Sequence, residues 1–196
     1  MVKSTLIDVA SKVTAVRKAS ANDPVALSRF PPGSELDTVR ILEEYCEEVH
    51  RCVDCGDVPA LVLTTLESLR IPTSLIELNR ITSGPSVSGL SIGSRFAKGD
   101  IMDEDGEVYR IEEHWINVGI ASNDTFLLNL TTEEVMFSDQ YFWRYGEGNR
   151  SRVVAPDMLT FVNEYMFGAK YVELVDPSEL EDPEGWYATL VANGWA

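Results

Sequence analysis

The sequence is poor in basic residues and in long apolar runs. It has 196 residues, with 16 Lys+Arg against 32 Asp+Glu, and hence a formal net charge of −16. Binding to a bare nucleic-acid backbone depends on Lys and Arg side chains that displace counterions, so this balance argues against it. No run approaches the roughly 20 consecutive apolar residues that cross a bilayer. We therefore expect neither a nucleic-acid-binding nor a membrane-spanning protein.

Cysteine is also scarce. The three cysteines all lie between Cys46 and Cys55, which is too few and too clustered for a disulfide framework. The first 20 residues mix charged with apolar side chains and lack the continuous apolar core of a secretory signal. We expect a cytoplasmic protein.

What the chain does have is enough apolar mass for a core. Hydrophobic residues make up 44% of the sequence, and the mean hydropathy is −0.08. Whole-chain disorder is not expected at this composition, despite the charge. The length suits one good-sized domain.

Helical periodicity dominates the first third of the chain. Apolar residues recur at helical spacing over 4–20, over 36–49 and over 59–69. Ile71-Pro72 breaks the chain, and Ser74 with Glu77 resembles a capping box for a short helix at 75–81. The run from Ser83 to Gly99 is rich in Gly and Ser, and we expect it to be a loop or an edge element of low local stability.

Strand-like runs follow, and helices then return. Asp105-Gly106 and the segment 131–134 are expected to close two hairpins. We expect helix at 156–167 with Gly168 as its C-cap, a last strand at 172–175, and a helix from Asp182-Pro183 to Asn193-Gly194. The expected strands are Asp100–Asp103, Val108–Glu112, Ile116–Ile120, Thr125–Leu130 and Val135–Phe137.

This order predicts an α+β fold, with a central, mostly antiparallel sheet, helices packed at one face and extra N-terminal helices. We expect an N-terminal helical extension at 1–58, packed on a core domain at 59–196, the whole forming one compact unit.

One cluster of metal-binding residue types is present. Cys46, His50, Cys52 and Cys55 are zinc-ligand types, but four ligands within ten residues leave no loop to fold around a metal. Cys46 also shares the apolar face of its predicted helix, where a thiol behaves as a small hydrophobe. We expect structural thiols and neither metal nor cofactor, with zinc binding as the alternative.

Gly89-Leu90-Ser91-Ile92-Gly93 matches the G-x-S-x-G nucleophile elbow of serine hydrolases. That turn requires a strand before it, a helix after it and a histidine to activate the serine. The residues that follow are weak helix formers, and His114 lies in the predicted strand region. We expect no catalytic site here, and a serine hydrolase is a lesser alternative.

Two further motifs are incomplete. Asp103, Asp105, Gly106 and Glu112 imitate part of a calcium-binding loop, but Ile101 occupies its first ligand position. We expect a solvated hairpin turn there. Gly146-Glu147-Gly148 lacks the third glycine of a dinucleotide fingerprint.

Aromatic residues concentrate late in the chain, and most of them are expected to fill the core. Tyr141, Phe142, Trp143, Arg144 and Tyr145 cannot all point inward from one regular element. Aromatic and Arg side chains are the usual anchors of protein interfaces. We therefore expect Tyr141, Phe142, Trp143 and Arg144 to bind a partner, together with the acidic residues Asp103, Glu104 and Asp105.

Three stretches resemble the SUKH superfamily of bacterial toxin-immunity proteins and fungal cell-wall-synthesis regulators. Residues 66–78 resemble its opening helix, proline break and second helix. Residues 116–137 resemble its central hairpin, and residues 154–162 resemble the helix after its sheet. The resemblance implies a non-catalytic α+β domain that binds a partner protein.

The net charge indicates which kind of partner protein to expect. A nuclease toxin is basic, and a partner at −16 gains attraction and a fast encounter rate from opposite charge. We expect an immunity protein that neutralises a basic toxin domain, for example a nuclease. The alternatives are a regulatory adaptor of the same fold or a small metal-dependent or serine hydrolase.

Overall fold

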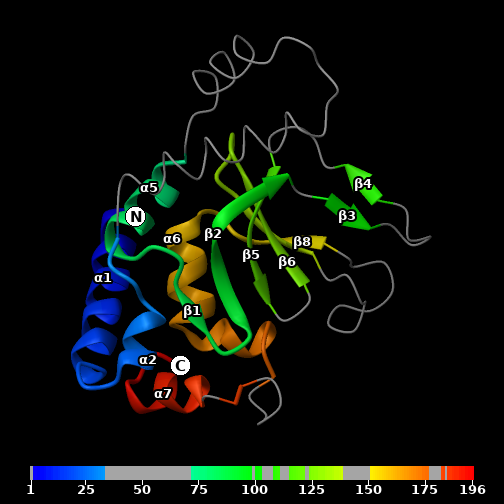
Figure 1. Cartoon of the computed structure of the whole chain (residues 1–196). Helices are drawn as coiled ribbons and strands as arrows, with labels where there is room; N and C mark the ends of the chain where they lie inside the picture. The colour runs from blue at the N-terminus through cyan, green and yellow to red at the C-terminus, as the bar shows by residue number, and fades with distance from the viewer. Residues whose placement is uncertain are drawn as a thin grey trace.

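The computed structural model of the chain describes residues 2–33, 72–98, 100–102, 108–110, 115–121, 124–138, 151–176, 182–183 and 185–196 (Figure 1). The helices expected over 36–49 and 59–69 lie outside these residues.

The described strands form one six-stranded antiparallel sheet and a separate two-stranded pair. The larger sheet has the order β1-β2-β5-β6-β7-β8, and β3 pairs with β4. The pairing of β3 with β4 and of β6 with β7 confirms the two expected hairpins. The strands are β1 (Ser86–Val87), β2 (Leu90–Lys98), β3 (Asp100–Met102), β4 (Val108–Arg110), β5 (Trp115–Ala121), β6 (Asp124–Asn129), β7 (Val135–Ser138) and β8 (Ser151–Ala155).

Helices cover one face of this sheet, so the predicted α+β fold is confirmed. Figure 1 shows α6 between the sheet and α1, with α5 beside both and α7 at the end where the chain terminates. The helical elements are α1 (Val2–Ala19), α2 (Pro24–Ser28), α5 (Thr73–Ile81), α6 (Met158–Phe161), the π-helical turn η1 (Val162–Met166), the 3-10 helix η2 (Ala169–Glu173) and α7 (Trp186–Ala192).

The core lies between the sheet and α6. Side chains alternate along a strand, and the inward residues of β5, β6 and β7 are completely buried. Phe126 of β6 has its ring 4.6 Å from that of Phe161 in α6 and 5.2 Å from that of Phe137 in β7. The buried inward residues are Ile116, Val118, Phe126, Leu128, Val135 and Phe137.

Helix α1 is part of the same core. Val9, Val13 and Val16 follow helical spacing and are buried in the same hydrophobic cluster as the sheet residues. The Arg17 guanidinium donates to the backbone carbonyls of Phe30 at 2.9 Å, Pro31 at 2.6 Å and Ile81 at 3.0 Å. Burial lowers the pKa of Arg17 from its ordinary value. These bonds fix α1 to the chain that follows α2 and to the end of α5.

Of the loop or edge element expected from Ser83 to Gly99, the structure has strands at the β1 end of the described sheet and not a loop. Ser86–Val87 and Leu90–Lys98 form β1 and β2, and β2 pairs with β1 on one side and β5 on the other. Ser88, with a φ of 48°, and Gly89 make the turn between them. Pairing with β5 satisfies the backbone of a segment whose composition alone favours a loop.

Helix α5 confirms the expected helix, but its start is not the predicted capping box. Ser74 lies inside the helix, and its hydroxyl accepts a hydrogen bond from the Met158 backbone N–H at 3.4 Å. Glu77 pairs with Arg80 at 2.6 Å. The first amides of α5 are instead bonded by Glu133, from a different part of the chain.

The last third of the chain contains two corrections. Gly168 is extended, with a φ of −144°, and does not end its helix in the left-handed conformation of a glycine C-cap. A Cβ there would lie 2.6 Å from the Glu164 carbonyl oxygen, so close approach is what requires glycine. The expected strand at 172–175 is wrong, because Ala169–Glu173 is the 3-10 helix η2.

Helix α7 is confirmed and ends as expected. The Asp182 carboxylate accepts hydrogen bonds from the backbone N–H of Trp186 and Tyr187, both at 2.8 Å, which satisfies two amides at the helix start. Gly194 follows the helix with a φ of 69°. Asp182 is itself buried and accepts a hydrogen bond from the Ser88 hydroxyl, which ties the helix start to the β1–β2 turn.

Among the described residues, the late aromatics largely fill the core, as predicted. Phe161, Tyr165, Phe167, Tyr171 and Trp186 are all nearly or completely buried. No helix in the described ranges is long and apolar enough to cross a membrane.

Candidate interaction surface

The predicted partner-binding residues lie outside the described residues. This applies to Tyr141, Phe142, Trp143 and Arg144 and to Asp103, Glu104 and Asp105. Their chain neighbours are described, however. Strand β8 begins at Ser151, six residues after Tyr145, and β3 and β4 flank the range 103–107. Strand β8 is therefore the described element that directly follows the aromatic run.

Strand β8 is an outer strand of the six-stranded sheet. Its partner in the sheet is β7, with Met136 opposite Val153 and Phe137 opposite Arg152. Ser151, Arg152 and Val153 are all exposed, and Val153 keeps 51% of its surface accessible to solvent. Three consecutive exposed residues differ from the alternation of a strand with one covered face. Such an edge is a template for pairing with another chain.

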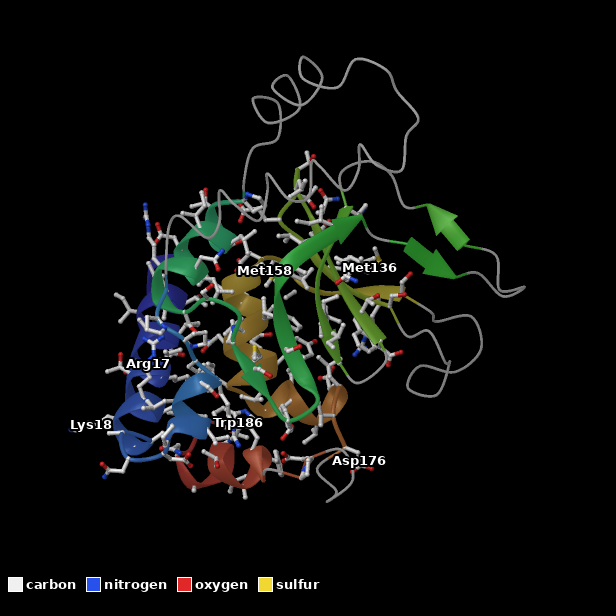
Figure 2. The ribbon with its side chains drawn as sticks, in the orientation of Figure 1. Arg17, Lys18, Met136, Met158, Asp176 and Trp186 are labelled. Atoms are coloured by element: carbon white, nitrogen blue, oxygen red, sulfur yellow. The ribbon has the colours of Figure 1, made fainter. Side chains whose placement is uncertain are left out.

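Val153 ends an apolar row on the sheet face opposite the helices. Leu127 of β6 lies opposite Met136 of β7, which lies opposite Val153 of β8. Leu127 is completely buried, Met136 half-buried and Val153 half-exposed. Figure 2 labels Met136 on the side of the sheet away from α1. The row becomes more exposed toward β8, so an apolar side chain placed beside Val153 would continue it.

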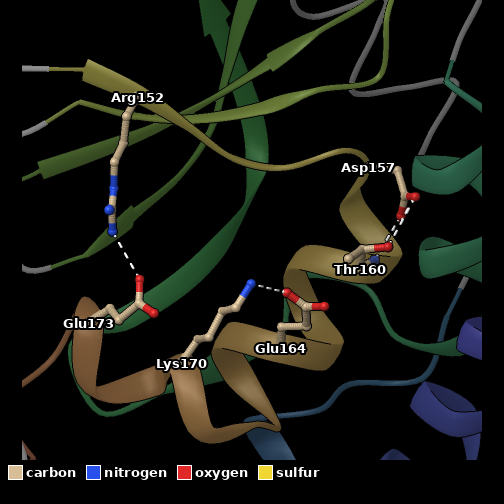
Figure 3. A network of polar contacts seen from close by, with 6 residues as sticks. All are labelled: Arg152, Asp157, Thr160, Glu164, Lys170 and Glu173. Carbon is tan, nitrogen blue, oxygen red and sulfur yellow. Dashed lines mark hydrogen bonds and ion pairs between the residues drawn. The ribbon is translucent and has the colours of Figure 1, made fainter.

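Arg152 lies on the other face of β8 and meets the helical layer. Its guanidinium bonds to the Glu173 carboxylate of η2 at 3.0 Å, and Figure 3 shows this pair beside the Lys170–Glu164 pair. Both partners of each pair are substantially exposed. Exposed ion pairs contribute little to stability, which leaves these charges able to exchange partners with a bound molecule.

Tyr165 and Lys170 connect this polar group to the core. The Lys170 ammonium lies 2.5 Å from the Glu164 carboxylate and 5.4 Å from the centre of the Tyr165 ring. The hydrogen bond with Glu164 raises the pKa of Lys170. Burial, and then the nearby charge of Glu173, raise the pKa of Tyr165. We refer to Ser151, Arg152 and Val153 with Lys170 and Glu173 as the β8 edge.

The other motifs found in the sequence do not assemble a site in the described residues. Ser91 lies within β2, opposite Ser86 on one side and Ile120 on the other, and is not at a strand-to-helix turn. Among the residues that the structure describes, no group of three or more His, Cys, Asp or Glu side chains is placed to hold a metal ion. The Cys46, His50, Cys52 and Cys55 cluster lies outside those residues, as does most of the calcium-like motif.

The β8 edge was not among the sites predicted from the sequence. A weak signal was present, because Arg152-Val153-Val154 places two β-branched residues just before Pro156. The edge position of this strand follows from the sheet order, which the sequence does not display.

Comparison with protein-family models, with curated protein sequences and with solved structures finds no match to this chain.

Proposed function

We propose that this chain is a non-catalytic protein-binding domain of the SUKH type, acting as an immunity protein that neutralises a basic toxin domain. The observation that carries the proposal is the clustering of acidic residues in a chain with a net charge of −16. Four of the five residues 103–107 are acidic, and so are four of the six residues 43–48.

Charge concentrated in a few ranges of the chain favours electrostatic recognition. A uniform surplus of acidic residues promotes solubility, whereas a local surplus creates a field that attracts an oppositely charged partner and accelerates encounter. Asp103, Glu104, Asp105 and Glu107 are the densest acidic group, and the first three of them are among the residues predicted to bind a partner. Toxin domains that cleave nucleic acid carry basic surfaces for the same electrostatic reason.

The β8 edge supplies a place for such a partner to dock. An extended partner segment can add to an exposed sheet edge through backbone hydrogen bonds, while side chains on alternate faces give specificity. At β8 the two faces differ, since Val153 offers apolar surface and Arg152 with Glu173 offers charge. The aromatic run Tyr141–Tyr145 precedes β8 directly and supplies anchors of the type that dominate interface energies.

The order of elements supports the SUKH resemblance. The residues that resemble the family's central hairpin begin at 116. They include most of β5 and all of β6, and β7 follows from Val135. Residues 154–162 run from the end of β8 through α6, a helix following the sheet.

The decisive experiment concerns the gene immediately upstream. For an immunity protein we expect it to encode a large secreted protein with a basic C-terminal domain. That domain, expressed alone, should be toxic to cells and should lose its toxicity when this chain is co-expressed. The purified pair should form a stable complex. If the domain is toxic with or without this chain, the immunity role is wrong, and tight binding without protection would point to the adaptor alternative.

A further inference from the structure

A pocket of about 120 Å³ lies between the C-terminal half of α1 and helix α7. Ala15 and Ala19 of α1 present little more than methyl groups toward α7, which leaves the space open. The opposite wall is aromatic and polar, formed by Trp186, Thr189, Asn193 and Trp195, and Arg29 completes the lining. A cavity of about 150 Å³ lined by apolar side chains accepts benzene, so this pocket is of the size of a single ring.

Both indoles are held in place by contacts outside the pocket. The Trp186 Nε1–H donates to the Met166 carbonyl at 2.7 Å. The rings of Trp186 and Trp195 both pack against the buried Phe167, at 5.7 Å and 5.6 Å. Walls fixed in this way lose little conformational entropy when a ligand binds. Trp186 has committed its N–H donor, so its ring offers an apolar wall.

The backbone of Arg29 is also held in place by contacts with its surroundings. Its carbonyl accepts a hydrogen bond from the Ser86 amide at 2.8 Å, and the next residue, Phe30, packs against Trp186 with ring centres 5.7 Å apart. These contacts fix the backbone that carries the guanidinium at the wall of the pocket. Arginine recognises carboxylates through paired hydrogen bonds.

Basic side chains lie near this pocket. Arg29 lines it, and the Lys12 ammonium lies 5.9 Å from the centre of the Trp195 ring. Figure 2 shows Arg17 and Lys18 near the end of α1, on the same side of the molecule as Trp186.

From the aromatic walls, the ring-sized volume and the arginine in its lining, we propose that this pocket binds a small aromatic carboxylate. The ring lies against the indoles of Trp186 and Trp195, and the carboxylate accepts hydrogen bonds from Arg29. This site is separate from the β8 edge and does not depend on the proposed immunity function.

The test is a titration of the full chain with benzoate and with benzamide, its neutral analogue of nearly the same shape. Binding is followed through the indole N–H signals in ¹H–¹⁵N NMR spectra, with the Trp195 signal assigned from Trp195→Phe. Benzoate should move the Trp195 signal and bind about tenfold more tightly than benzamide, because a hydrogen bond to a charged group contributes more than one to a neutral group.

Three variants locate the site. Ala19→Phe places a ring in the pocket from an exposed helix position and should abolish binding of both compounds. Arg29→Gln should reduce benzoate affinity about tenfold and benzamide affinity much less, so that the preference for benzoate is largely lost. Lys18→Gln removes a neighbouring charge that does not line the pocket, and should preserve the preference for benzoate. Circular dichroism confirms that each variant is folded.

Three results would overturn the proposal: benzoate that leaves the Trp195 signal unmoved in the wild-type chain, binding that survives Ala19→Phe, or benzamide that binds as tightly as benzoate.

Discussion

The carboxylate of Glu133 accepts hydrogen bonds from the backbone N–H of Thr73 at 3.0 Å and of Ser74 at 3.1 Å. Glu133 belongs to the turn between β6 and β7, whereas Thr73 begins α5, and 60 residues of chain separate them. Glu133 also has a φ of 66°, an uncommon conformation for a non-glycine residue. A side chain from the turn between β6 and β7 thus accepts the hydrogen bonds that an N-cap residue would accept at the start of α5.

Replacing Glu133 with Ala is expected to lower the free energy of unfolding by about 1–2 kcal/mol, the cost of losing an N-cap. Glu133→Gly removes the same hydrogen bonds, but glycine adopts the left-handed conformation without strain. The free energy of unfolding should therefore fall by less than in Glu133→Ala. Urea unfolding measures both. Glu134→Ala, in the same turn, is the control and should change stability by less than either. Equal stability of Glu133→Ala and the wild type would show that these hydrogen bonds contribute nothing.

Gly33 is expected to tolerate no side chain. A Cβ there would lie 2.0 Å from the Asn79 carbonyl oxygen and 2.4 Å from the Arg80 carbonyl carbon. Both are backbone atoms of α5 and cannot move independently, so Gly33→Ala should cost about 1–3 kcal/mol by overpacking. Gly194→Asn is the matched control, because Gly194 has a φ of 69° with nothing near its Cβ position, and Asn tolerates that conformation. The two melting temperatures should differ clearly, with Gly33→Ala the lower.

Stability should fall as the pH rises through about 10. Burial and the charge of Glu173 raise the pKa of Tyr165 above its ordinary 10.0. A group whose pKa is higher in the folded state stabilises the fold below its unfolded pKa and loses that contribution as pH rises through the folded pKa. Lys170, whose pKa is raised by Glu164, acts in the same direction.

Urea unfolding between about pH 8 and 11 tests this linkage. Tyr165→Phe should make the decline in stability shallower than in the wild type, because Phe has no proton to lose. Tyr187→Phe removes a half-buried tyrosine elsewhere and is the matched control. An unchanged slope in Tyr165→Phe would mean that the buried phenol does not contribute to the alkaline loss.

At the proposed interface, charge should govern association and aromatic anchors should govern dissociation. Changing Asp103 and Asp105 to Asn, together with Glu104 and Glu107 to Gln, should slow binding to the basic toxin domain by about tenfold at low salt and weaken the salt dependence. Trp143→Ala should leave the on-rate nearly unchanged and speed dissociation, at a cost of about 2 kcal/mol. Surface plasmon resonance at several salt concentrations separates the two rates. Normal binding by Trp143→Ala would assign the aromatic run to packing.

The β8 edge can be tested with two valines of equal exposure. Val153 on β8 and Val191 on α7 are each 51% exposed. Val153→Lys places a charge on the strand edge and should weaken partner binding about tenfold or more, because edge lysines oppose strand pairing. Val191→Lys should bind normally. If both variants bind normally and remain folded, the partner docks elsewhere.

Much of the fold is predictable because local chemistry decides it. The valines of α1 recur at helical spacing, and β3 and β4, which lie on either side of Asp105-Gly106 in the sequence, pair as expected. At the start of α7, Asp182 caps amides only four and five residues ahead. In each case the interacting residues are close in sequence, so the pattern itself carries the information.

Tertiary structure decided the features that depend on distant residues. The Gly- and Ser-rich run around Ser91 became strand because β5 pairs with it, and its composition favours a loop. Gly168 is required by the nearby Glu164 carbonyl and not by a left-handed turn. The segment after it became a 3-10 helix against the core in place of the expected strand.

The two candidate sites, the β8 edge and the pocket at Arg29, also depend on tertiary structure. Val153 is an edge residue only because β8 is last in the order of the described strands, and the pocket at Arg29 brings residues 15–29 together with residues 186–195. Composition alone determined that the chain is acidic and has apolar residues for a core, since these are sums over residues. Where its exposed edge and its pocket lie is set by packing between elements, because a surface exists only after the chain has folded.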